Sequence, residues 1–301
     1  QLQNKYWILV CLLGLCWGSS FIFFEILLED LPPVLVVYLR IVIAALIMLP
    51  FVIRQLIHLT NFKKNIFNLG IMGLLNNVFP FTLIAIGQQT TTAGLASILN
   101  ANTAFLTIII APLFIPNEDL KLRRLIGVII GILGVIIAVD ISDIFSDKID
   151  GYGEFYILMA TLSYAFAAIW GKIKLNNLLP FVSAAGMLMA STLLMTPLII
   201  IKYYEILFDI KPFTLLIAVI FSTFCTVFAY VLYFKILDGA GAGNLLLSTI
   251  LIPPIAIILE ILFLNNRIEL FELIGMMITI AGLLFLDGRI VQFIRFYFLK
   301  K

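Results

Sequence analysis

The stretch "LIGVIIGILGVIIAVD" at residues 125–140 decides the fold class. It lacks the alternation of apolar and polar positions that marks a strand of a membrane β-barrel. A helix satisfies its own backbone hydrogen bonds in lipid, so the stretch predicts a membrane-spanning helix. The whole chain agrees, since 63% of its 301 residues are hydrophobic and only 12% are charged. Soluble domains are about half apolar and a quarter charged. We therefore predict an all-α integral membrane protein.

Ten stretches have the roughly 20 apolar residues that one membrane span needs. The predicted spans are 6–27, 34–53, 66–86, 93–114, 125–141, 154–173, 180–201, 213–236, 242–264 and 272–290. The first of these is long enough to cross a membrane and lacks a small-residue cleavage site, so we expect no cleavable signal peptide there.

Lysine and arginine gather on one side of the predicted spans. With the N-terminus in the cytoplasm, the inner side holds Lys5, Arg54, Lys63, Lys64, Lys121, Arg123, Arg124, Lys172, Lys174, Lys235, Arg289, Arg295, Lys300 and Lys301. The outer side holds Lys148, Lys202, Lys211 and Arg267. The positive-inside rule then predicts that both termini are cytoplasmic. The tail, 291–301, is basic and aromatic, and we expect it to lie on the inner leaflet as an amphipathic extension.

The opening stretch has a second copy, "LIGMMITIAGLLFLDG", at residues 273–288. Four residues recur with an offset of 148, namely Leu125, Ile126, Gly127 and Gly134 as Leu273, Ile274, Gly275 and Gly282. Ala93-Gly94 likewise recurs as Ala242-Gly243, with an offset of 149. We predict two five-helix repeats, 1–150 and 151–290. Because five is odd, the second repeat enters the membrane from the opposite side, as in transporters whose halves rock around a central site. The glycines themselves suit close helix packing.

Three charged residues lie inside predicted spans: Glu25, Arg40 and Glu260. All three are expected in the outer half of the membrane. A charge there is costly unless it faces an interior or a partner, so we predict that one or both carboxylates pair with Arg40. The pair could be purely structural. Alternatively, Arg40 binds a substrate carboxylate, or one glutamate takes up protons.

Neutral polar and aromatic residues inside the spans are the other candidates for substrate binding. An amide buried without a partner is costly, so these side chains should face the interior, where they either line a pocket or join helices. The candidates are Trp17, Ser20, Asn76, Asn77, Asn100, Tyr164, Tyr230 and Ser248. The pair Pro253-Pro254 is expected to interrupt the ninth span.

Several classes of function have no support in the sequence. Cys11, Cys16 and Cys225 lie in apolar runs and are read as small buried hydrophobes, and His58 is the one histidine. We therefore expect no metal site, no cofactor and no enzymatic activity. The chain has no "GxxxxGK[ST]" loop for nucleotide binding. A net charge of +2 gives no reason to expect nucleic-acid binding.

The sequence resembles the EamA branch of the drug/metabolite transporter superfamily. The resemblance rests on "WGSSFIF…LPPVLVVYLR", "TTAGLASILNANTAFLTIIIAPLF", the opening stretch and "AGAGNLLLSTILIPPIAIILE". It implies ten helices, an inverted repeat and a central cavity that binds a small metabolite. The chain departs from the family pattern at Glu25, Ala104, Glu260 and the pair Asn265-Asn266, and these departures leave the substrate open.

The resemblance leads us to predict a secondary transporter that exports an amino acid or a related polar metabolite by alternating access. Its expected location is the cytoplasmic (inner) membrane, as a monomer or homodimer in the lipid bilayer. An uptake or exchange carrier for a host-derived compound is the alternative, followed by a channel or a membrane scaffold without transport.

Overall fold

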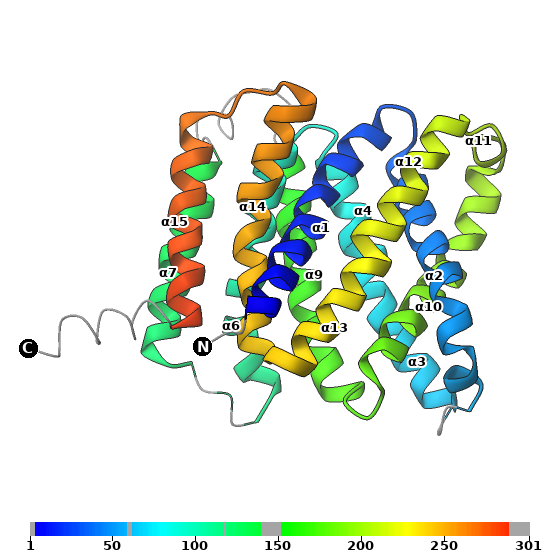
Figure 1. Cartoon of the computed structure of the whole chain (residues 1–301), viewed down its shortest axis with the longest axis horizontal. Helices are drawn as coiled ribbons and strands as arrows, with labels where there is room; N and C mark the ends of the chain where they lie inside the picture. Colours follow the sequence, from blue (N-terminus) through cyan, green and yellow to red (C-terminus); the bar gives the residue numbers. More distant parts are fainter. Residues whose placement is uncertain (1–3, 59–61, 117, 119, 140–151, 289–301) are drawn as a thin grey trace, which may run out of the picture.

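The structure, a computed structural model, describes residues 4–58, 62–116, 118, 120–139 and 152–288. The loop around Lys148 and the tail 291–301 lie outside the described residues. Within those ranges all regular structure is helical, as the sequence predicts. The helices run between the two ends of one bundle (Figure 1). The start of α1 and the end of α15 lie at the same end of this bundle, the lower one in the figure.

The described elements follow one another along the chain in two parts, before and after residues 140–151. The first part of the chain forms α1 (Asn4–Leu28), α2 (Pro33–Ile57), α3 (Phe62–Gly73), the π-helical turn η1 (Leu74–Val78), α4 (Phe79–Gly87), α5 (Ala93–Asn100), α6 (Asn102–Phe114) and α7 (Leu122–Ala138). The second part forms α9 (Tyr152–Lys174), α10 (Pro180–Lys202), α11 (Tyr204–Phe208), α12 (Pro212–Ser222), the π-helical turn η2 (Thr223–Phe228), α13 (Ala229–Ala240), α14 (Ala242–Leu264) and α15 (Leu270–Asp287).

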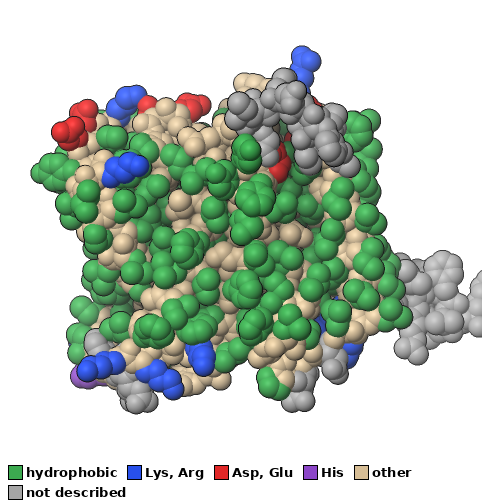
Figure 2. Space-filling model, turned by 180° about the vertical axis from the view of Figure 1, so that it is seen from behind, with side chains coloured by type: hydrophobic (Ala, Val, Ile, Leu, Met, Phe, Trp, Pro, Cys, Tyr) green, Lys and Arg blue, Asp and Glu red, His purple; other side chains and the backbone are tan. Residues whose placement is uncertain are grey.

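Nine helices among the described residues are long and apolar enough to cross a membrane. They correspond to nine of the ten predicted spans. The remaining predicted span, 125–141, corresponds to α7, which has 17 residues. This length is at the lower end of the usual spanning length of about 17–25 residues. Figure 2 shows hydrophobic side chains across the middle of the rear face, between charged side chains at its two edges. Large apolar residues are widely exposed, among them Leu113, Leu193, Ile201 and Leu262. A lipid environment accounts for this exposure.

The glycines shared by the two copies of the opening stretch bring α7 and α15 into backbone contact. A Cβ atom on Gly127 would lie 2.9 Å from the Gly282 carbonyl oxygen, and one on Gly134 would lie 2.8 Å from that of Gly275. Any larger side chain would push the helices apart. The predicted packing role of these glycines is therefore confirmed, because membrane helices associate through close van der Waals contact between small residues.

Three features of the helices differ from the predictions. The span 93–114 is divided at Ala101 into α5 and α6. The spans 66–86 and 213–236 each contain a π-helical turn, η1 and η2. By contrast, α14 continues from Ala242 to Leu264 with Pro253 and Pro254 inside it, so the expected interruption of the ninth span is wrong.

Candidate functional site

Arg40 lies on α2 and is buried, with 5% of its surface exposed. Its guanidinium Nε donates a hydrogen bond to the Thr226 hydroxyl at 3.0 Å, and Nη2 donates to the Ser20 hydroxyl at 3.5 Å. Ser20 belongs to α1 and Thr226 to η2. Segments distant in the sequence thus meet at this one cation, through neutral hydroxyl groups.

Aromatic rings surround the same guanidinium. The Arg40 Cζ atom lies 3.9 Å from the ring centre of Phe81, 4.6 Å from that of Phe221 and 5.4 Å from that of Phe24. The negative face of an aromatic ring attracts a cation, and the attraction grows when water is excluded. The three rings therefore offset part of the cost of burying the charge and restrict how the guanidinium can move.

The predicted ion pair between Arg40 and a carboxylate is wrong: within the described residues, neither Glu25 nor Glu260 pairs with it. Both carboxylates instead accept hydrogen bonds from the first residues of α5. The Ala93 amide donates to Glu25 at 3.1 Å, and the Gly94 amide donates to Glu260 at 2.6 Å. The amino end of a helix carries free N–H groups and a partial positive charge, so it stabilises carboxylates.

Asn266 joins the two glutamates. Its Nδ2 atom donates to Glu260 at 3.0 Å and to Glu25 at 3.3 Å. It follows α14, while Glu25 lies on α1 and Glu260 on α14. The structure thus brings Glu25 and Glu260 together, as the sequence analysis expected of residues at a similar depth, but around the start of α5 and not around Arg40.

The turn η1 places two adjacent amides inside the bundle. Asn77 is fully buried and donates from Nδ2 to the Ser191 hydroxyl on α10 at 3.1 Å. Asn76 donates to the Tyr230 hydroxyl on α13 at 3.5 Å. A π-helical turn rotates the following residues relative to an α-helix and is common at functional sites. Asn76, Asn77 and Tyr230 thus take the interior positions that the sequence analysis expected.

The remaining predicted site residues are divided between this interior and other places. Tyr164 packs with its ring centre 6.4 Å from that of Phe81, one of the rings beside the Arg40 guanidinium. Trp17 packs against Tyr233, with 6.0 Å between ring centres. The Asn100 Oδ1 atom is buried without a hydrogen-bond partner in the part of the chain that the structure describes.

Ser248 is not joined to the others by its hydrogen bond. It is fully buried and donates to the Leu245 carbonyl of its own helix at 2.7 Å.

We define the polar cluster as Ser20, Arg40, Asn76, Asn77, Tyr164, Ser191, Thr226 and Tyr230.

Sequence reasoning missed the rings of Phe24, Phe81 and Phe221, and it missed Ser191 and Asn266. The three phenylalanines carry no local signal, because phenylalanine is frequent throughout the spans. Asn266 did have a signal: it stands beside Asn265 at the end of a span, at the level expected for Glu25 and Glu260. The prediction that all three cysteines are buried is wrong for Cys11, which is exposed, while Cys16 and Cys225 are buried.

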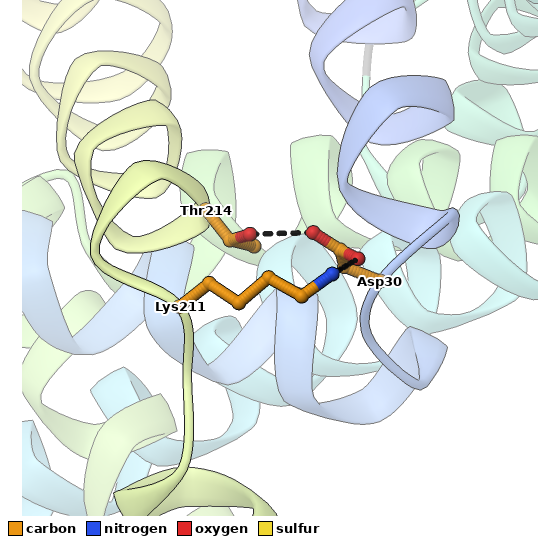
Figure 3. Close-up of polar contacts among 3 residues, drawn as sticks. All are labelled: Asp30, Lys211 and Thr214. Atoms are coloured by element: carbon orange, nitrogen blue, oxygen red, sulfur yellow. Dashed lines mark hydrogen bonds and ion pairs between the residues drawn. The ribbon is translucent and has the colours of Figure 1, made fainter.

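A second group of polar contacts lies at one end of the bundle. Lys211 donates to Asp30 at 2.6 Å, and the Thr214 hydroxyl donates to the other carboxylate oxygen at 2.5 Å (Figure 3). Asp30 lies between α1 and α2, and Lys211 directly precedes α12. The hydrogen bond from Lys211, followed by that from Thr214, lowers the pKa of Asp30, and Asp30 raises the pKa of Lys211. Asp30, Lys211 and Thr214 line a surface depression at this end.

The fold and its interior together define the class of protein. A helical bundle with a widely apolar exterior and a buried polar cluster is a multi-pass membrane protein. The chain belongs to the EamA-like transporter family, whose model matches residues 4–139 and again residues 151–286.

Individual relatives agree with this family over most of the chain. A transporter of Archaeoglobus fulgidus is 24% identical over 288 residues, which cover 93% of this chain and 96% of the relative. The Bacillus subtilis transporter YoaV is 21% identical over 89% of this chain and 92% of its own. A Salmonella typhimurium protein named "Probable amino-acid metabolite efflux pump" is 23% identical over 94% of both chains.

A solved crystal structure shares the fold of this chain. It matches with a TM-score of 0.67 over 96% of this chain and 99% of its own, at 14% sequence identity. At this identity the likeness shows the fold alone.

Proposed function

We propose that the protein is a secondary transporter that exports a small polar metabolite, an amino acid or a related compound, across the cytoplasmic membrane by alternating access. It transports without catalysing a reaction. The observation that carries the proposal is the buried polar cluster around Arg40. Polar and ionisable residues inside a membrane bundle are costly and usually mark the path of a substrate. The name of the Salmonella typhimurium relative, an amino-acid metabolite efflux pump, supports the choice of substrate.

Alternating access requires two halves that can move against each other, and we propose that these are the predicted inverted repeats, 1–150 and 151–290. The double match of the family model supports this division. The π-helical turns support it too, since η1 begins at Leu74 and η2 at Thr223, 149 residues later. This is the offset that the sequence shows between Ala93-Gly94 and Ala242-Gly243.

The count of ten spans and the cytoplasmic position of both termini belong to the same proposal. The shared location of the start of α1 and the end of α15 is consistent with it. So is the distribution of charge, because Figure 2 shows lysine and arginine along the lower edge and a mixture of acidic and basic side chains along the upper edge. Basic residues concentrate on the cytoplasmic side of membrane proteins.

Counterflow in liposomes tests the function. Purified protein is reconstituted into vesicles preloaded with one unlabelled proteinogenic L-amino acid and diluted into a trace of the same compound in labelled form. We expect transient accumulation of the label that saturates with concentration for at least one compound, and none in vesicles without protein. Flux that never saturates would indicate a channel. Failure to move any compound of the panel would overturn the proposal.

A further inference from the structure

We propose that Arg40 binds a carboxylate group of the transported metabolite. The site is the guanidinium held between Phe81 of α4 and Phe221 of α12, with Ser20 and Thr226 at its hydrogen-bonded nitrogens. This inference rests on the proposed function, because it names the chemical class of the substrate that the transporter carries.

The first argument is the unbalanced charge. Arg40 is 5% exposed, and its hydrogen bonds go to two neutral hydroxyls. Among the described residues it forms no ion pair, and the two carboxylates predicted as its partners, Glu25 and Glu260, are bound to the start of α5. A buried charge is normally paired. A bound anion would supply the missing partner, and one that arrives and leaves with each transport cycle explains why the described residues provide no permanent one.

The second argument is the number of donors left over. A guanidinium has five N–H groups, and the hydrogen bonds to Thr226 and Ser20 start from Nε and Nη2 only. No hydrogen bond to a described residue starts from Nη1. The side carrying Nη1 and the second hydrogen of Nη2 therefore has no hydrogen-bond acceptor among the described residues, and we assign it to the substrate. A carboxylate matches two such parallel donors, which gives both strength and a fixed orientation.

The third argument is that the site is rigid. The ring centres of Phe81 and Phe221 lie 3.9 Å and 4.6 Å from the Arg40 Cζ atom. The hydroxyl partners, Ser20 and Thr226, both belong to helical segments. Cation–π contacts with two rings and hydrogen bonds to two hydroxyls together limit the positions that the guanidinium can take. Less conformational freedom is then lost when an anion binds, and preorganisation of this kind raises affinity.

The charge of the site favours a carboxylate over a doubly charged phosphate. Arg40 is the one charged member of the polar cluster, so it balances one negative charge. The other members offer amides and hydroxyls, such as Asn76 and Tyr230, which are 3.5 Å apart. Their oxygen atoms can accept hydrogen bonds from the polar remainder of a metabolite, including the α-ammonium group of an amino acid.

The test compares each amino acid with its α-amide, which has nearly the same shape but no carboxylate charge. Wild-type vesicles are assayed by counterflow with both compounds of each pair. We expect the amide to be carried about 10- to 100-fold less efficiently than the acid, the range expected for losing hydrogen bonds to a charged group. Arg40→Gln should lower flux of the acid by a similar factor. Arg40→Lys should recover part of it, since the charge is kept and the planar fork is lost.

The matched control is Arg54→Gln, which removes the same charge from an exposed position on the same helix and should leave flux unchanged. Saturable flux that treats acid and amide alike, or normal flux in Arg40→Gln, would overturn the carboxylate site while leaving the transport function intact. Absence of flux for every compound would overturn the function and the site together. If Arg40→Gln fails to fold, the comparison of acid and amide on the wild-type protein decides alone.

Discussion

Gly94 is the residue at which Glu260 contacts the start of α5. Its amide donates to Glu260 at 2.6 Å, and an added Cβ atom would lie 2.6 Å from the same oxygen and 2.9 Å from Ile257 Cγ1. Gly94→Ala should therefore displace a buried carboxylate from its donor. We expect a loss of about 1–3 kcal/mol of stability, the cost of leaving a buried polar group unsatisfied, measured by thermal unfolding in detergent.

Gly70→Ala provides the matched control. Gly70 lies in α3, and an added Cβ atom there would meet nothing within 4 Å. Alanine is favoured over glycine inside a helix by roughly 0.5–1 kcal/mol, so this variant should be unchanged or slightly more stable. Equal losses in the two variants would contradict a specific role for the contact between Gly94 and Glu260.

The depth of charged residues could be predicted from the sequence, whereas their partners could not. Counting residues along each span placed Glu25 and Glu260 at one level, and Asn266 does join them. The same counting placed Arg40 nearby and led to the wrong ion pair. Depth follows from the rise of a helix, but the direction of a side chain around the helix axis depends on which helices are neighbours. That information is not local in the sequence.

At the scale of elements, η1 is the feature that aims Asn77 at α10. Asn77 is completely buried, and its bond to Ser191 measures 3.1 Å. A double-mutant cycle with Asn77→Ala and Ser191→Ala should give a coupling of about 0.6 kcal/mol, the average for hydrogen bonds between membrane helices. Thermal or denaturant unfolding of the two single variants and the double variant supplies the values.

The control cycle pairs Asn77→Ala with Thr192→Ala. Thr192 neighbours Ser191, but its hydroxyl donates to the Leu188 carbonyl of its own helix. Its coupling to Asn77 should be close to zero, because residues that share no partner act additively. A coupling as large as that of Ser191 would show that the effect comes from general repacking of α10.

Long apolar helices were predictable as elements because each one repeats its signal over about twenty residues. The π-helical turns and the division at Ala101 were not, since an extra residue within one turn leaves the apolar composition unchanged. At Pro253 and Pro254 the sequence led us to predict a break that the structure does not have. Their missing N–H groups suggested a break, yet α14 continues through both, which membrane helices can tolerate when neighbouring groups compensate.

At the scale of the whole molecule, ion pairs join the two proposed repeats at both ends of the bundle. Asp30 of the first repeat binds Lys211 of the second at one end. Glu118 of the first binds Lys172 of the second at the other. In a transporter that opens to each side in turn, such contacts would have to break alternately. The pair Asp30–Lys211 also leads to a definite prediction about pH.

The pair Asp30–Lys211 should stabilise the protein only within a defined pH range. The pKa of Asp30 lies below its ordinary 3.8, so its contribution is present above that value and is lost as the pH falls through the lowered pKa. The pKa of Lys211 lies above its ordinary 10.5, so its contribution is present below that value and is lost as the pH rises through the raised pKa. Lys211→Met should lower the thermal unfolding midpoint by a constant amount between about pH 5 and pH 9. The difference from wild type should shrink below pH 3.8. Because both groups are exposed, it should also shrink in high salt.

Lys202→Met is the control: Lys202 is exposed at the end of α10 and its contact is with the Tyr203 ring, not a carboxylate. A difference for Lys211→Met that persists unchanged into acid would mean that the pair adds nothing and that the substitution acts through packing alone.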